Sequence, residues 1–221
     1  MDNSIYTSCL ERIFDSAVTE RPLNETIRFV QAEKFSSIVE AIRAETQYDK
    51  RNKLKQHLPA FFPTVLIRSS GNQLNENSVP TGIVQFDIDK KDNPATDLEK
   101  LKSEIILLPE LSYLFVSPNN GLKFGLLTDF QKNEKEDIES LKKRFSLAYQ
   151  HTLDYIRSNT QVEFVADKAV GHLKHACYLS SDKNAYWHST PEKLRINHSC
   201  IVQKSAAIFH EKTFIGSDFV E

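Results

Sequence analysis

Hydrophobic and polar positions alternate along the stretch TGIVQFDIDKK. Because successive side chains of a strand point to opposite faces, the alternation predicts a strand with Val84, Phe86 and Ile88 on an apolar face. Asp87 and Asp89 then project together from the other face. Two carboxylates at adjacent positions of one face repel each other, and open water or a bound cation relieves this repulsion. The spacing alone favours a solvated strand end over a cation site.

Apolar residues recur with a helical period in three other segments. In FSSIVEAIRAET they follow serines that are suitable as helix caps. In TDLEKLKSEI, Thr96 and Glu99 form a capping-box pattern at the start of the stripe Leu98, Leu101 and Ile105. A longer helix is predicted by one apolar face, which consists of Ile138, Leu141, Phe145, Ala148, Thr152 and Ile156.

Short apolar runs between turn-forming residues predict the strands. LPAFFPTVLIR and TGIVQFDID flank a polar connection, which suggests a β-hairpin with a long loop. LSYLFVS and LKFGLLT flank the turn PNNG and predict a second hairpin, and VEFVAD and HACYLSS predict two later strands. This order of elements predicts an α+β fold in which helices pack on a mainly antiparallel sheet.

Composition narrows the class of protein. Among 221 residues, 40% are hydrophobic and 26% charged, which is typical of a soluble globular protein. No apolar run approaches the length of a membrane span and no signal-peptide pattern is present, so we expect a cytoplasmic protein that does not associate with membranes. The three scattered cysteines fit a reducing compartment. The length fits one large domain or one domain with extensions.

The net charge of −2 conceals two basic regions. Lysine and arginine outnumber acidic residues between Lys168 and Lys204, a segment that also holds four histidines. A second run, DKRNKLKQH, carries four lysines and arginines behind a single aspartate. Such runs are usually solvated, but one that faces the carboxylates would suit a phosphate-rich ligand.

The candidate chemistry lies where predicted strands end. Asp87 and Asp89 leave one strand on the same face, and Asp167 ends another. Carboxylates in this pattern can hold Mg²⁺ or Mn²⁺. These ions bridge triphosphate oxygens, and a lysine neutralises the negative charge that remains. In the turn SPNNGLK, Lys123 can supply that charge, and Gly121 would let the backbone approach a ligand closely.

Four stretches, taken in order, resemble a known family: LPAFFPTVLIR, TGIVQFDID, YLFVSPNNGLKFGL and FVADKAVGHLKHACYLSSDKNAYW. They look like the virulence-protein-E N-terminal-domain family, which occurs in bacterial mobile elements and is related to the archaeo-eukaryotic primase (primase–polymerase) superfamily. The resemblance covers residues 35–190, and its most specific parts are the D-x-D strand and the S-P-x-x-G-x-K turn. It implies a primase–polymerase-like, RRM-like catalytic core over residues 35–190, with extensions over 1–34 and 191–221.

The resemblance also implies a role for each matching residue. Asp87, Asp89 and Asp167 would be catalytic and would hold Mg²⁺ or Mn²⁺. The nucleotide and its phosphates would be bound by a second group, which consists of Ser117, Gly121, Lys123, Lys174 and His175. The implied activity is that of a divalent-metal-dependent nucleotidyltransferase that uses nucleoside triphosphates on nucleic acid, on a single-stranded template, in replication of a mobile element. A helicase is a further expected partner.

Departures from the family pattern keep an alternative open. Lys123 stands where active primase–polymerases commonly have histidine, although lysine is usual in the virulence-protein-E branch. His175 stands in place of the expected arginine, which makes a permanent phosphate contact pH-dependent. The alternative is a catalytically degenerate module that binds nucleic acid or a partner. It is favoured if Asp167 points away from the other carboxylates or if Lys123 occupies the metal position.

Other site classes are less favoured by the sequence. A zinc site would draw on His172, His175, Cys177, His198 and Cys200, but their spacings do not match the usual ligand pairs. No nucleophile elbow and no P-loop is present. The HLKH spacing also does not provide the neighbouring same-face histidines that a relaxase requires.

Overall fold

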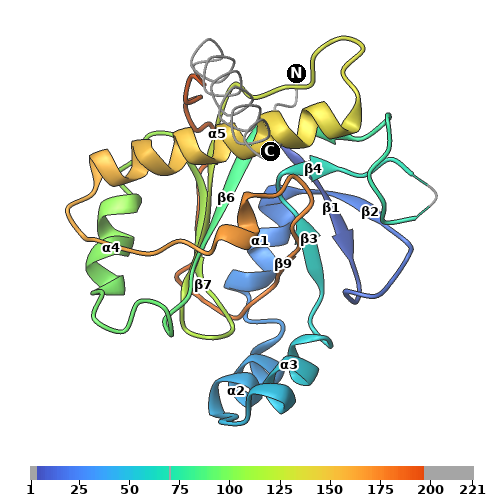
Figure 1. Ribbon diagram of the computed structural model, residues 1–221. Helices are drawn as coiled ribbons and strands as arrows, with labels where there is room; N and C mark the ends of the chain where they lie inside the picture. The colour runs from blue at the N-terminus through green and yellow to red at the C-terminus, as the bar shows by residue number, and fades with distance from the viewer. Residues whose placement is uncertain (1–3, 70, 197–221) are drawn as a thin grey trace, which may run out of the picture.

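The computed structural model describes residues 4–69 and 71–196, with the elements arranged as in Figure 1. The strands are β1 (Tyr6–Leu10), β2 (Thr19–Pro22), β3 (Ala60–Phe62), β4 (Val65–Leu66), β5 (Val79–Pro80), β6 (Ile83–Ile88), β7 (Leu111–Val116), β8 (Leu122–Leu127), β9 (Cys177–Tyr178) and β10 (Tyr186–Trp187). The helices are α1 (Leu23–Gln31), α2 (Ser36–Ala44), α3 (Tyr48–Lys55), α4 (Leu98–Ile105), α5 (Ile138–Asn159) and the 3-10 helix η1 (Lys168–Gly171). The predicted α+β class with antiparallel sheets is confirmed.

The strands form two four-stranded antiparallel sheets and a small ribbon. One sheet has the order β10-β7-β8-β6, and the other has the order β2-β1-β3-β9. The predicted hairpin around PNNG is confirmed as β7 and β8, which pair through Val116 and Leu122 at the turn. The register of β6 against β8 places Asp87 directly opposite Lys123.

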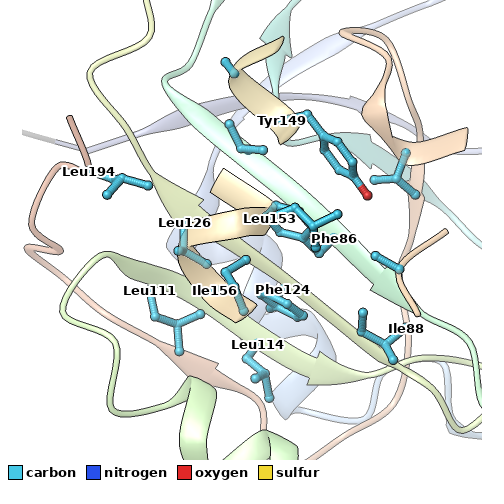
Figure 2. Close-up of a cluster of buried hydrophobic side chains, with 14 of the residues drawn as sticks. Phe86, Ile88, Leu111, Leu114, Phe124, Leu126, Tyr149, Leu153, Ile156 and Leu194 are labelled. Carbon is cyan, nitrogen blue, oxygen red and sulfur yellow. The ribbon is translucent and has the colours of Figure 1, made fainter. Parts of the chain in front are cut away.

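Helices α4 and α5 cover one face of the β10-β7-β8-β6 sheet (Figure 1). Phe86 of β6 lies at the centre of this core, where its ring stacks on Phe124 at 5.3 Å and on Tyr149 of α5 at 4.9 Å between centroids. Figure 2 shows these rings beside Leu153 and Ile156 of α5. The apolar half of the alternation in β6 therefore packs as predicted.

The opposite face of this sheet is also covered. Tyr113 and Phe115 pack there with Phe61 and Cys177 of the second sheet, and α1 contributes to the same core. Gln85 is consequently only 3% exposed, and its side-chain amide donates a hydrogen bond to the His175 carbonyl at 2.9 Å. The carboxylate-bearing face is therefore covered along most of its length, and the cleft lies near the end of β6.

The predicted helices form, but both predicted caps are wrong. The N-cap of α2 is Phe35, which makes no side-chain cap hydrogen bond, and the two serines lie inside the helix. The three apolar patterns correspond to α2, α4 and α5, and the stripe Leu98, Leu101 and Ile105 is buried as expected. The N-cap of α4 is Asp97, whose carboxylate accepts from the Lys100 amide at 3.0 Å. The predicted Thr96 capping box is therefore wrong, because the helix begins one residue later and aspartate is an equally good cap.

Two strand predictions are corrected by the structure. VEFVAD is irregular rather than a strand, and it leads into the 3-10 helix η1. The hairpin expected across the long polar loop is limited to β4 and β5, whereas β6 pairs with β8 in another sheet. Gly82, with φ of +86°, precedes β6 and allows this change of direction.

The N-terminal residues contribute to the main fold. Strand β1 pairs with β3 through Cys9 and Phe61, so residues on both sides of position 35 share one sheet. The division into a domain at 35–190 and two extensions stays a prediction. None of the helices within the described ranges is long and apolar enough to cross a membrane.

Truncation of Phe86 should test the core beneath β6. We expect Phe86→Ala to lower the free energy of unfolding by about 3–5 kcal/mol, because a fully buried ring is replaced by a cavity. Phe14→Ala is the matched control, since Phe14 is 75% exposed. Urea unfolding of the three proteins measures the difference, and equal midpoints for both variants would contradict this packing.

The Glu136 carboxylate should make stability depend on acid pH. Arg144 donates to it from Nε at 2.8 Å and from Nη2 at 2.7 Å, and the Asn133 amide donates at 2.9 Å. These bonds lower the pKa of Glu136, the Arg144 bond most of all, so the folded state holds the proton less tightly than the unfolded state. The contribution to stability is therefore complete above the unfolded pKa near 4.5 and is lost as pH falls through the folded pKa.

We expect the loss of stability in Glu136→Gln to be largest at neutral pH and to shrink as the pH is lowered below 4.5. Urea titrations at several pH values measure it. Glu139→Gln is the control, because the Glu139 side chain is 73% exposed. A difference from wild type that stayed constant at every pH would rule out this linkage.

Candidate functional site

A cleft of about 170 Å³ opens where β6 ends beside the β7–β8 turn. Segments that are far apart in sequence contribute to it, including the C-terminus of α3, the residue before η1 and the chain leading into β9. Its lining residues are Lys55, Asp87, Asp89, Ser117, Pro118, Lys123, Asp167, His175, Ala176 and Tyr178. Six of these were predicted as site residues from the sequence, and Gly121 and Lys174 are the two predicted residues that do not line it.

Asp87 and Lys123 form the centre of the cleft floor. Their side chains are 13% and 11% exposed, and the Lys123 ammonium donates to Oδ2 of Asp87. Burial disfavours the ammonium charge, but the Asp87 carboxylate outweighs this effect, and the net result raises the pKa of Lys123. The other carboxylate oxygen, Oδ1 of Asp87, is buried and has no hydrogen-bond partner.

Asp89 lies one strand repeat beyond Asp87, at the rim of the cleft. Its side chain is 21% exposed and approaches the Lys91 ammonium at 3.7 Å. Burial, followed by the charge of Asp87, raises the pKa of Asp89. The two carboxylates therefore repel each other across a partly dry space, as expected from alternation along β6.

Asp167 reaches the cleft through a backbone contact. Its amide donates to the Asp87 carbonyl at 2.9 Å, which holds the irregular segment against the end of β6. Its carboxylate caps η1, where Oδ1 accepts from the Ala169 amide at 2.9 Å. Tyr149 donates its hydroxyl to the Asp167 carbonyl at 3.2 Å. The Asp167 side chain thus lines the cleft, while its Oδ1 atom caps η1.

The β7–β8 turn supplies the next wall. Ser117 is 2% exposed, and its hydroxyl accepts from the Gly121 amide at 3.0 Å. A Cβ at Gly121 would lie 2.3 Å from the carbonyl of Ile88, so glycine is required for the turn to approach the end of β6. Gly121 therefore permits the close approach of the turn to Ile88 within the protein. The expected role of Gly121, a close approach of its backbone to a ligand, stays a prediction.

His175 lines the cleft but Lys174 does not. Burial, together with the charge of Lys123, lowers the pKa of His175, so its neutral form is favoured. Lys174 is directed to a different groove, where its ammonium lies 3.3 Å from Oδ1 of Asn72 and 5.7 Å from the ring centre of Phe62. The two residues predicted as neighbouring nucleotide contacts are thus separated by the structure.

Four lining residues were not predicted as site residues from the sequence: Lys55, Pro118, Ala176 and Tyr178. Lys55 ends α3, within the basic run DKRNKLKQH that was noted for its charge. Tyr178 belongs to β9 and packs against the small core of α2 and α3 as well as lining the cleft. The basic run was the only signal for Lys55, because α3 lacks an apolar stripe and has no buried residue.

The three aspartates expected to hold a metal ion do not form a three-ligand site. Among residues 4–69 and 71–196, no group of three or more histidine, cysteine, aspartate or glutamate side chains is placed to hold a metal ion. Asp87 and Asp89 are therefore the pair available to a cation, and Asp167 does not complete a set of three. Of the residues considered for zinc, His198 and Cys200 lie outside the described residues. Cys177 is a core residue, and burial raises the pKa of its thiol to about 12.

The family model of the BT4734-like N-terminal domain matches residues 53–187. This match covers more than half of the chain. The protein belongs to the BT4734-like N-terminal-domain family. All the residues that line the cleft, from Lys55 to Tyr178, lie within the matched range. No curated protein and no solved structure matches the chain.

Removal of the Lys123 charge should destabilise the fold. We expect Lys123→Met to cost about 3–5 kcal/mol of unfolding free energy, because it leaves the Asp87 carboxylate buried without a counter-charge. The double variant Asp87→Asn, Lys123→Met removes both charges and should recover a large part of the loss. Urea unfolding measures all three proteins. A single variant as stable as wild type would contradict the buried ion pair.

Proposed function

We propose that this protein is a divalent-metal-dependent nucleotidyltransferase of the primase–polymerase type, which acts on nucleic acid with nucleoside triphosphates. The observation that carries the proposal is the common location of residues that the family resemblance selected from separate parts of the chain. Asp87, Asp89, Ser117, Lys123 and Asp167 come from three different segments and line one cleft. Two carboxylates beside a lysine are the chemical groups that metal-dependent phosphoryl transfer requires.

The residues present fit a hard divalent cation. Oδ1 of Asp87 is buried and unpartnered, and Asp89 lies beside it with a pKa raised by burial and by the charge of Asp87. A cation would provide the missing partner and relieve the repulsion between the two carboxylates. Mg²⁺ is commonly held by only one or two carboxylates together with substrate phosphates and water, so a third protein carboxylate is not required.

The bound metal would activate the attacking hydroxyl and neutralise phosphate charge. The protein would supply the surrounding contacts. The Lys123 ammonium, next to Asp87, is positioned to interact with a phosphate as well as with the carboxylate. The buried Ser117 hydroxyl orders the turn by accepting from the Gly121 amide, and in this way it fixes the wall of the cleft.

A second candidate function rests on a specific contact. The Lys123 ammonium already neutralises Asp87, and the Asp167 carboxylate caps η1. This arrangement also suits a module that keeps the fold and binds nucleic acid or a protein partner without catalysis. The two candidates differ in one property, because only the first requires a divalent cation for triphosphate binding.

The wider setting is part of the same proposal. The resemblance to the virulence-protein-E N-terminal-domain family supports a role in replicating a mobile element, with a single-stranded template and a helicase as partners. A cytoplasmic location would follow from such a role. These proposals depend on the activity and are tested after it.

Metal-dependent triphosphate binding is the first test. We expect isothermal titration to detect binding of a nucleoside triphosphate in the presence of Mn²⁺ and not with EDTA. The Asp87→Ala, Asp89→Ala double variant should lose this binding, because it removes both available cation ligands. Asp92→Ala is the matched control, since its side chain is 50% exposed and lies outside the cleft.

Primer synthesis on single-stranded DNA and RNA templates then tests catalysis directly. Product formed by wild type and by Asp92→Ala, but not by the double variant, would support a nucleotidyltransferase. Triphosphate or nucleic-acid binding that is indifferent to metal and to both aspartates would instead support the non-catalytic module.

A further inference from the structure

Lys55 occupies a position in the cleft for which neither the sequence motifs nor the family match provides a role. It is the last residue of α3, is half-buried, and lines the cleft with Asp87, Asp89 and Lys123. In Figure 1 the helices α2 and α3 lie together below the two sheets. Lys55 is the residue through which this pair of helices contributes to the cleft.

The position of Lys55 is fixed by packing on both sides of it in the sequence. Leu54 and Leu58 pack in a small core with Val39 and Ile42 of α2. Tyr178 packs against the same core and also lines the cleft. The C-terminus of α3 is thus attached to β9, and the Lys55 side chain is directed into the cleft by a packed segment.

The Lys55 ammonium has no hydrogen bond and no ion pair within the described residues, in contrast to Lys123. Burial, and then the charge of Lys123, lower the pKa of Lys55, while Asp89 and Asp87 act in the opposite direction. A partly buried cation without a direct partner is less stable than a solvated one. An anion in the cleft would restore the missing interaction.

We propose that Lys55 binds the polyphosphate group of a nucleoside triphosphate in this cleft. The proposal rests on the proposed function and adds a residue that selects for the number of phosphates. Lys123 shares its ammonium with Asp87, whereas the Lys55 ammonium has no ion pair among the described residues and is fully available to a phosphate. Each additional phosphate adds negative charge near this group, so triphosphate should be preferred over monophosphate, and the preference should depend on Lys55.

The test compares Lys55→Gln with Lys53→Gln, a change of the same type at an exposed position of the same helix. Isothermal titration with Mn²⁺ measures the affinity for a nucleoside triphosphate and for its monophosphate. We expect Lys55→Gln to weaken triphosphate binding roughly tenfold or more, since it removes a charge-assisted contact. Monophosphate binding should change much less, and Lys53→Gln should stay within about twofold of wild type.

A second titration separates this proposal from the proposed function. Inorganic tripolyphosphate without metal probes the cationic part of the cleft alone. We expect Lys55→Gln to weaken tripolyphosphate binding and Lys53→Gln to leave it unchanged. Thermal unfolding followed by circular dichroism checks that both variants retain the fold.

Each outcome has a defined meaning. Lys55-dependent tripolyphosphate binding without metal-dependent nucleotide binding would support this inference and overturn the proposed function. Metal-dependent triphosphate binding that is lost in the aspartate double variant but unchanged in Lys55→Gln would overturn this inference and leave the function in place. Absence of binding to both probes, or equal weakening by Lys55→Gln and Lys53→Gln, would also overturn it.

Discussion

The buried ion pair between Asp87 and Lys123 is the interaction on which the cleft depends. It joins two strands that face each other in register, and it holds two charges where little water reaches them. Loss of one charge leaves the other without compensation, which is far more costly than loss of both. A slip of β6 by one residue would direct Asp87 into the core around Phe86 and Tyr149. The core and the charge pair therefore specify the same register.

Both faces of the β10-β7-β8-β6 sheet are covered, and this restricts where its polar side chains can meet a ligand. Helices α4 and α5 close one face, and α1 with the second sheet closes most of the other. Gln85 illustrates the consequence, because it shares a face with Asp87 and yet is buried against the His175 carbonyl. Polar groups become accessible only where β6 ends. Asp87 and Asp89, successive acidic residues of one face, lie at this end and line the cleft.

Local patterns predicted the parts of the site that arise from local structure. Alternation placed Asp87 and Asp89 on one face, and the turn residues placed Lys123 at the start of a hairpin strand. The pairing of that strand with β6 was not predicted, because it joins segments that are separated in the sequence. Asp167 was selected for the wrong reason, because its segment reaches β6 through one backbone hydrogen bond and a helix cap instead of a strand. Lys55 had no periodic signal, since α3 has no apolar stripe and no fully buried residue, and its position depends on contacts with residues far along the chain.

The formal charge of the cleft explains why a bound divalent cation would change its affinity for a polyphosphate. Three aspartates and two lysines line it, which gives a formal charge of −1 when His175 is neutral. Burial and the charge of Lys123 lower the pKa of His175 and favour that neutral form. A polyphosphate alone would therefore meet a site of slightly negative net charge, where the Lys55 ammonium supplies the local attraction. One divalent cation would reverse the sign of the site to +1, so that cation and polyphosphate would each favour binding of the other. The ion pair between Asp87 and Lys123 adds no net charge, so the sign of the site depends on Asp89, Asp167 and Lys55.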